Sequence, residues 1–140
     1  MSEPALHRAP LVAIVDDEKD IVTYLRLALE DNGFQVFPIT ESATALERLA
    51  AAEPDVVCLD LLMPNHTGVA LYAEIIRHPD LAGCPVLIMS GLTPKEDLPQ
   101  ILEEAGNLPQ PAFFIEKPIR VELFIEALSE ILRTAEGASI

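Results

Sequence analysis

Short apolar runs alternate with segments of helical periodicity along most of this chain, and no other feature limits the fold as strongly. A short run that is apolar almost throughout is typical of a strand buried on both faces of a parallel sheet. In the segments between the runs, apolar residues recur at about every third or fourth position, which indicates amphipathic helices. The runs are Leu11–Val15, Phe34–Ile39, Val56–Leu59, Val86–Met89 and Ala112–Ile115.

Signals for the ends of helices support this division. Asp31–Gly33 would end the first helix, His78–Pro79 the third and Gly106 the fourth, because Gly and X-Pro sequences stop helices. Thr40 would cap the start of the second helix. The clearest helical pattern is the last, Val121–Leu132. Strands that alternate with helices predict a doubly wound α/β domain, with a parallel sheet and helices on both of its faces.

The predicted domain covers residues 11–133, between tails at residues 1–10 and 134–140. The formal net charge of −14 argues against direct nucleic-acid binding, because phosphate requires a basic surface. The sequence has neither an apolar stretch of about 18 residues nor the apolar core of a signal peptide, so we expect a cytoplasmic protein with no membrane span. Cys58 and Cys84 lack metal-ligand spacing, and we expect both to be reduced thiols.

Polar side chains that could bind a ligand or take part in a reaction follow the predicted strands. Asp16 and Asp17 follow the first run, Asp60 the third and Ser90 the fourth, and Lys117 lies just after the fifth. Because doubly wound sheets bind ligands outside the carboxyl ends of their strands, we expect these side chains to converge. Each one alone has a structural explanation, as a helix cap, a turn residue or an exposed loop residue. Their joint placement at strand ends favours a site.

Carboxylates that lie this close repel one another, and the group can either keep a proton or bind a cation. A site that offers oxygen ligands and leaves some coordination positions of the metal to water suits Mg²⁺. A magnesium ion beside a lysine neutralises the charge of a phosphoryl group. In such a site Asp60 would be the nucleophile that accepts the phosphoryl group, while Ser90 and Lys117 would bind its oxygens.

With these motifs the chain resembles the receiver domain of bacterial two-component response regulators. The resemblance rests on the sequences Asp16–Glu18, Asp60–Gly68, Ser90–Gly91 and Lys117–Pro118, and it covers Leu11–Arg133. The spacing D-x-x-M-P-x-x-x-G after the third run is specific, and the full set in this order is more so. The resemblance implies a flavodoxin-like (βα)5 fold with a five-stranded parallel sheet in the order 2-1-3-4-5.

The resemblance also implies a role for each residue of the site. Asp60 would be the phosphoacceptor, and Asp17 and Asp60 would bind Mg²⁺ directly. Asp16 would act on the metal through water, and the backbone carbonyl of Leu62 would complete the protein ligands. Lys117 would hold a phosphoryl oxygen, and its bond to the following proline would be cis, which is uncommon in folded proteins.

Further positions would govern the response to phosphorylation. Ser90 corresponds to the switch hydroxyl. Phe114 stands where the family commonly has a tyrosine, and it could equally be a core residue without a hydroxyl to bond. Leu62 and Leu92 would flank the phosphoryl group, and since they cannot orient a water molecule we expect slow loss of phosphate. The proline-rich loop Asn107–Pro111 is longer than usual, and it either alters the output face or is neutral.

The function implied is signalling in a bacterial two-component system. A histidine kinase, or a histidine phosphotransfer protein of a phosphorelay, would phosphorylate Asp60, and the altered receiver would regulate a protein target. We expect no enzyme activity beyond self-catalysed phosphotransfer and slow autodephosphorylation. The alternatives are a haloacid-dehalogenase-like phosphatase, disfavoured because no D-x-D-x-T follows the first run, and a degenerate receiver that only binds partners. Apolar residues around the third helix, Leu71 and Ile75, leave a homodimer open.

Overall fold

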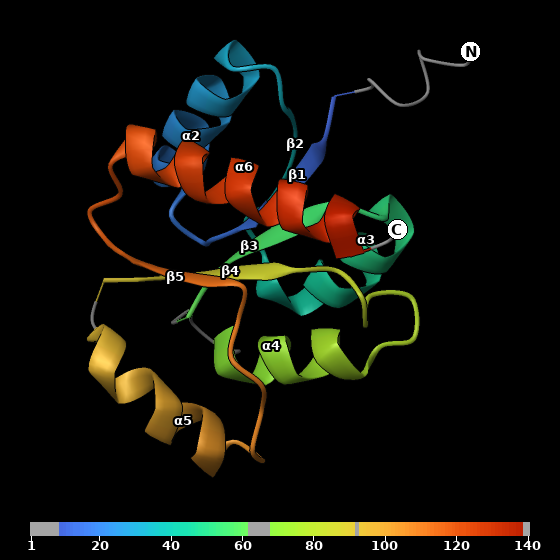
Figure 1. The fold of residues 1–140 in the computed structure, drawn as a ribbon, viewed down its shortest axis with the longest axis vertical. Coiled ribbons are helices and arrows are strands. Elements are labelled where there is room, and N and C mark those ends of the chain that lie inside the picture. Colours follow the sequence, from blue (N-terminus) through green and yellow to red (C-terminus); the bar gives the residue numbers. More distant parts are fainter. Residues whose placement is uncertain (1–8, 62–67, 92, 139–140) are drawn as a thin grey trace.

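The computed structural model describes residues 9–61, 68–91 and 93–138, which form a central sheet between two layers of helices (Figure 1). The strands are β1 (Leu11–Val15), β2 (Gln35–Ile39), β3 (Val56–Asp60), β4 (Val86–Ser90) and β5 (Phe113–Glu116). The helices are α2 (Lys19–Asp31), α3 (Ala45–Ala52), α4 (Gly68–Arg77), α5 (Leu98–Glu104) and α6 (Val121–Ala138), with the 3₁₀ turns η1 (Ser42–Thr44) and η2 (Lys95–Asp97).

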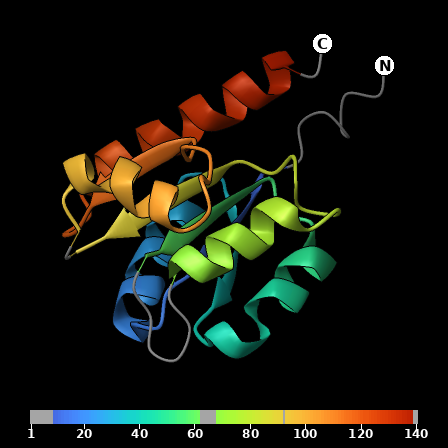
Figure 2. The same cartoon turned by 90° about the horizontal axis from the view of Figure 1, so that it is seen from below.

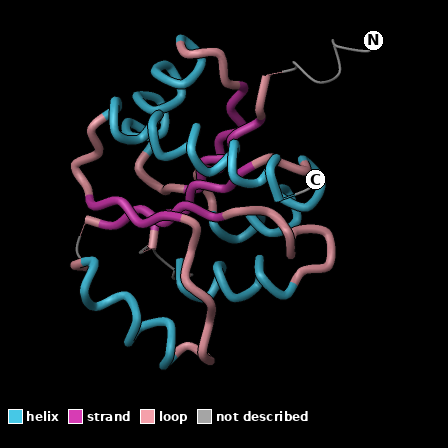
Figure 3. The backbone as a smooth tube through the Cα atoms, in the orientation of Figure 1, coloured by secondary structure: helices cyan, strands magenta, loops and turns pink. Residues whose placement is uncertain are grey.

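The strands are all parallel and lie in the order β2-β1-β3-β4-β5. This order confirms the predicted flavodoxin-like topology. The inner strands β3 and β4 are buried along their whole length, whereas the edge strands β2 and β5 are partly exposed. The strands, magenta in Figure 3, therefore lie together at the centre of the molecule with helices on either side.

Two apolar cores lie on opposite faces of the sheet. Helices α2 and α6 cover one core, and α3, α4 and α5 cover the other; Figure 2 views the molecule from below, the side on which α4 and α5 lie in Figure 1. Along β1, Val12 and Ile14 face the first core while Ala13 and Val15 face the second. Since successive side chains of a strand point to opposite faces, both sets must be apolar, and this explains the uninterrupted apolar runs.

The predicted helix ends hold for the first, third and fourth helices. Asn32 is the C-cap residue of α2 and the following Gly33 has φ +88°, a left-handed conformation that favours glycine. Gly106 follows α5 with φ +114°, and α4 ends at Arg77, just before the predicted stop. Helix α6 continues past Arg133 to Ala138, so the structure extends the last helix into the predicted tail.

The expectation that Thr40 caps the second helix is wrong. Glu41 still has an extended backbone, with φ −123° and ψ 120°, and the chain then forms the turn η1 before α3 begins at Ala45. Thr44, at the start of α3, makes no side-chain capping bond. The entry into this helix therefore depends on the 3₁₀ turn instead of a threonine cap.

The proline-rich loop Asn107–Pro111 packs against the domain. Leu108 is buried in the core under α4 and α5, and the Tyr72 hydroxyl of α4 donates a hydrogen bond of 2.7 Å to the Pro109 carbonyl oxygen. Burial raises the pKa of Tyr72 to about 12, which keeps its hydroxyl protonated as a donor. This loop is therefore fixed to α4 by both an apolar and a polar contact.

Both cysteines are free thiols, as the sequence predicts. Cys58 of β3 lies in the core under α2 and α6, whereas Cys84 packs against the core on the other face of the sheet. Among the described residues, no helix is both long enough and apolar enough to cross a membrane.

Candidate functional site

Three carboxylates meet at the carboxyl ends of β1 and β3. These strands are neighbours, with Val15 beside Leu59, so the residues that follow them share one edge of the sheet. Asp16, Asp17 and Asp60 each offer a carboxylate oxygen, and these oxygens lie within 4.8 Å of one another. Asp16 and Asp60 are buried and Asp17 is half-buried. The structure therefore brings together the three acids selected from the sequence, in a cluster that could hold a metal ion.

Lys117 reaches this cluster from the chain just beyond β5. Its ammonium group donates hydrogen bonds of 2.8 Å to Asp16 Oδ2 and 3.0 Å to Glu18 Oε1, and it lies 3.5 Å from Asp60 Oδ1. The backbone N–H of Lys117 donates to the Ser90 carbonyl at 2.8 Å. This bond extends the pairing of β4 with β5 and fixes the base of the lysine side chain next to the acids.

The charge of Lys117 is stabilised by its neighbours. Burial by itself lowers the pKa of a lysine, but here the hydrogen bonds that Lys117 donates to Asp16 and Glu18, and the attraction of Asp16 and Asp60, outweigh burial. The pKa of Lys117 therefore lies above its usual value, and the side chain is an ammonium ion. A fixed positive charge at this place can neutralise an anionic group attached to Asp60.

Asp16 has a structural contact as well as a place in the cluster. Its Oδ1 accepts the backbone N–H of Glu18 at 3.0 Å, while Oδ2 accepts the bond from Lys117. The structural explanation of Asp16 and Asp17 as a helix cap is wrong, because the N-cap residue of α2 is Glu18. Asp16 instead forms a side-chain turn with the Glu18 N–H. With both oxygens engaged by protein donors, Asp16 is less available than Asp17 for direct contact with a cation.

The backbone that presents Asp60 is tightly packed. Asp60 is the last residue of β3, and the next residue, Leu61, is buried and accepts the backbone N–H of Gly68 at 2.7 Å. A Cβ atom placed on Gly68 would lie 2.0 Å from the Asp60 carbonyl oxygen. Only glycine therefore fits where α4 begins against the end of β3. The predicted ligand Leu62 lies outside the described residues, as does the rest of the segment 62–67.

Ser90 lies at the end of β4, beside the lysine. Its side chain is buried, and its Oγ accepts the backbone N–H of Thr93 at 3.0 Å. A small cavity of about 190 Å³ opens here, lined by Ser90, Gly91, Thr93, Pro94, Glu116 and Lys117. The hydroxyl proton of Ser90 is thus next to a space that could take an added group. Leu92 lies outside the described residues.

Phe114 faces the interior. It is 8% exposed and belongs to the core that contains Leu98 and Leu102 of α5. This position agrees with its explanation as a core residue, and a switch role stays a prediction. The peptide bond between Lys117 and Pro118 is cis, as the resemblance implies.

Two acidic side chains near the site were missed by the sequence reasoning. Glu18 pairs with Lys117, and the carboxylate of Glu116 accepts the backbone N–H of Lys95 at 3.0 Å. The only sequence signal for Glu18 is its position next to the paired aspartates. Lys117, which Glu18 contacts, is far from Glu18 in the sequence, and Lys95, whose N–H Glu116 accepts, is far from Glu116.

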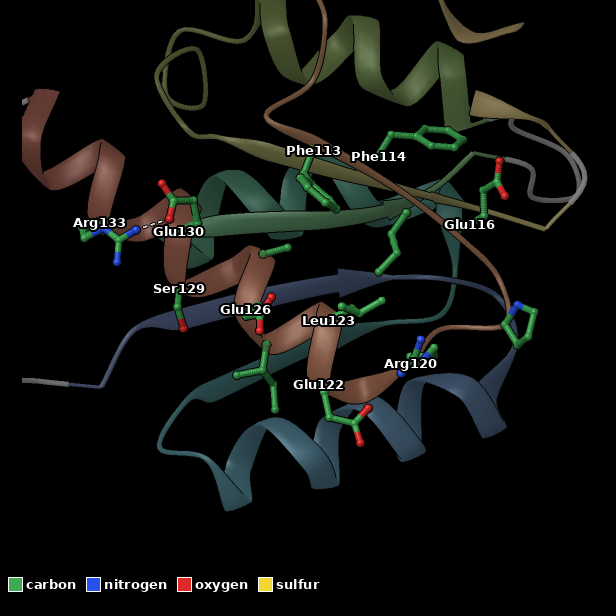
Figure 4. A pocket seen from close by; sticks show the side chains of 14 residues that line it. Phe113, Phe114, Glu116, Arg120, Glu122, Leu123, Glu126, Ser129, Glu130 and Arg133 are labelled. Atoms are coloured by element: carbon green, nitrogen blue, oxygen red, sulfur yellow. Dashed lines mark hydrogen bonds and ion pairs between the residues drawn. The ribbon is translucent and has the colours of Figure 1, made fainter. Parts of the chain in front are cut away.

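A larger groove lies away from the acids, between β5 and α6 (Figure 4). It measures about 870 Å³, and the half-exposed side chains Phe113 and Leu123 lie on it. Glu130 and Arg133 of α6 form an ion pair at its rim. No member of the acidic cluster lines this groove, so it is separate from the candidate site.

Comparison with known proteins identifies the class. Residues 12–129 match the family model of the response regulator receiver domain, and the chain belongs to this family. This confirms the resemblance noted in the sequence.

Relatives of known sequence and structure agree with this assignment. The transcriptional regulatory protein KdpE of Mycobacterium tuberculosis is 30% identical over 129 residues, which cover 92% of this chain and 54% of that protein. The chain thus spans about half the length of this relative. A CheY-like receiver domain protein from Methanospirillum hungatei superposes with a TM-score of 0.80 at 20% identity, over 93% of this chain and 98% of that one. The receiver domain of a signal transduction histidine kinase from Syntrophus aciditrophicus gives 0.76 at 28% identity, over 90% and 92%.

Proposed function

We propose that this receiver accepts a phosphoryl group on Asp60 with the help of Mg²⁺, and that the modified domain regulates a protein partner. The observation that carries the proposal is the position of the buried Asp60 carboxylate. It lies in a cluster with Asp16 and Asp17 and 3.5 Å from a lysine ammonium group. A nucleophile with a cation site on one side and a fixed positive charge on the other is suited to phosphoryl transfer, which depends on positioning and charge neutralisation.

The donor set fits Mg²⁺. The cluster offers carboxylate oxygens only, and hard divalent cations prefer oxygen ligands. Asp17 and Asp60 would bind the ion directly. Asp16 would act through water, since its oxygens already accept bonds from the Glu18 N–H and from Lys117. The Leu62 carbonyl would complete the protein ligands. When bound, Mg²⁺ supplies charge neutralisation for the phosphoryl oxygens.

The phosphoryl donor is a phosphohistidine of a histidine kinase or of a phosphotransfer protein, and the transfer takes place in the cytoplasm. A carboxylate oxygen of Asp60 forms a bond to phosphorus while the N–P bond of the phosphohistidine breaks and its electron pair returns to the imidazole. Lys117 then binds one phosphoryl oxygen. Ser90 donates its hydroxyl proton to another, because the one bond described for the hydroxyl group uses its oxygen as acceptor and leaves the proton free to donate.

The added charge favours a second packing of the domain. A phosphoryl group brings negative charge and three acceptor oxygens. Its bond to Ser90 pulls the loop between β4 and α5 toward Asp60. The equilibrium between the two packings shifts toward the one with more bonds to the phosphoryl group. A downstream protein, or a second copy of the chain, that recognises this packing receives the signal.

Intact mass spectrometry tests the proposal. The chain is incubated with Mg²⁺ and a small acyl phosphate donor, and we expect the mass to rise by one phosphoryl unit. Asp60→Asn, which keeps the size of the side chain, should abolish the gain, and so should removal of the metal with a chelator. A gain that persists in Asp60→Asn, or no gain in the unaltered chain, contradicts the proposal.

A further inference from the structure

The ammonium group of Lys117 lies off centre among its three carboxylates. An ammonium group has three N–H donors, and two of them make short bonds, to Asp16 at 2.8 Å and to Glu18 at 3.0 Å. The third carboxylate, Asp60, lies at 3.5 Å, a distance that is long for a charge-assisted hydrogen bond. The lysine is therefore held closer to the acids after β1 than to the proposed phosphoacceptor.

Glu18 differs from Asp16 in its surroundings. The Asp16 side chain is fully buried, whereas the side chain of Glu18 is 56% exposed. Glu18 is also the N-cap residue of α2, yet its carboxylate makes no bond to the helix backbone. The carboxylate is directed to Lys117 instead.

We propose that Glu18 is a positioning residue that holds Lys117 away from Asp60 in the resting protein and releases it when Asp60 carries a phosphoryl group. The inference rests on the proposed function and adds a residue to it. Of the two short bonds, the one to Glu18 is the easier to exchange, since water can solvate an exposed carboxylate after the lysine leaves. Losing the bond to Asp16 would leave a buried charge without its partner.

Lys117 must leave Glu18 before it can bind a phosphoryl group on Asp60. Phosphorylation is therefore less favourable by the free energy of the Glu18–Lys117 pair. Exposed ion pairs shift an equilibrium by roughly two- to fivefold. Removing the pair should therefore tighten the binding of a phosphoryl group, or of a mimic of it, by about the same factor. In the resting protein the lysine should at the same time move toward Asp60.

Three variants separate the contact from the charge. Glu18→Gln keeps the length of the side chain and removes the charge. Glu18→Asp keeps the charge but is one methylene too short to hold the same contact. Asp20→Asn removes an equal charge from an exposed residue in the first turn of the same helix and serves as the matched control. Thermal unfolding of each variant shows that the fold is retained.

The test uses beryllofluoride as the phosphoryl mimic, at saturating Mg²⁺, with the lysines labelled with ¹⁵N. The chain contains only Lys19, Lys95 and Lys117, so the ammonium signal of Lys117 can be assigned from a single Lys117→Arg variant. We expect that signal to move when beryllofluoride binds to the unaltered chain. In both Glu18 variants it should already be displaced without the mimic, and the mimic should bind roughly two- to fivefold tighter. Asp20→Asn should match the unaltered chain.

Two results would overturn the inference. One is an unchanged affinity and an unchanged Lys117 signal in both Glu18 variants. The other is tighter binding in Glu18→Gln and Asp20→Asn alike but not in Glu18→Asp, which would assign the effect to charge alone. In both of these results the unaltered chain still binds the mimic. If the unaltered, folded chain does not bind the mimic at all, the proposed function fails as well.

Discussion

Gly68 provides a sharp test of how the fold presents Asp60. Replacing it with alanine places a Cβ atom 2.0 Å from the Asp60 carbonyl oxygen and 2.6 Å from the backbone of Leu61. Both contacts are far inside normal van der Waals separation, and neither atom belongs to a side chain that could turn away. The start of α4 must therefore move away from the end of β3, or Asp60 must move with it.

The magnitude follows from two opposing contributions. Overpacking a well-packed site costs about 1–3 kcal/mol, and we take the upper end because the contacts are with backbone. Alanine recovers up to about 1 kcal/mol through its higher helix propensity. The net expected loss in the free energy of unfolding is about 2 kcal/mol. Phosphorylation should slow as well, because the displaced atoms include the main chain of the proposed phosphoacceptor.

Urea unfolding measures the first effect, and the rate of phosphoryl gain by intact mass measures the second. Gly83→Ala is the matched control, since a Cβ atom there meets nothing within 4 Å and the residue does not have a left-handed backbone. We expect it to stay within about 0.5 kcal/mol of the unaltered chain. If Gly68→Ala is as stable as Gly83→Ala and is phosphorylated at the normal rate, the close packing of α4 against Asp60 is refuted.

Other predictions concern the cores, the anchored loop and the lifetime of the phosphoryl group. Phe124→Ala should cost about 3–5 kcal/mol in urea unfolding because the ring is fully buried, whereas Phe113→Ala, with the side chain 42% exposed, should cost clearly less. Tyr72→Phe should cost about 1 kcal/mol below pH 10. Because the pKa of Tyr72 is raised to about 12, the unaltered chain should lose this advantage as the pH rises from 10 to 12, which unfolding at several pH values checks. If Leu62 and Leu92 cannot orient water, phosphoryl label should persist well beyond a few seconds, and faster loss contradicts that expectation.

The sequence specified the sheet because its strands are buried on both faces. An uninterrupted apolar run such as Val56–Leu59 has few structural explanations in a chain of this length, and its position fixed Asp60 at a strand end. Asp16 and Asp17 could be placed beside it because parallel strands end at one edge of the sheet. The convergence of the acids was therefore predictable from the strand ends together with the strand order that the family resemblance implies.

Contacts that depend on side-chain direction were not predictable. Glu18 and Lys117 are separated by 99 positions, and Tyr72 and Pro109 by 37, so no local pattern connects the partners. The choice of Glu18 between its own helix and the lysine depends on distances that only the folded structure sets. The prediction that Thr40 caps a helix failed for a different reason. A threonine before a helical pattern is a frequent cap, but here the extended backbone continues to Glu41.

The measurement that tests the central claim most directly is the location of the phosphoryl group. Borohydride reduces an acyl phosphate to an alcohol, and digestion followed by mass spectrometry then identifies the residue that carried it. We predict that in the presence of Mg²⁺ and an acyl phosphate donor the reduced residue is Asp60, with no reduction at Asp16 or Asp17. Reduction at either of those residues, or at none, would contradict the account.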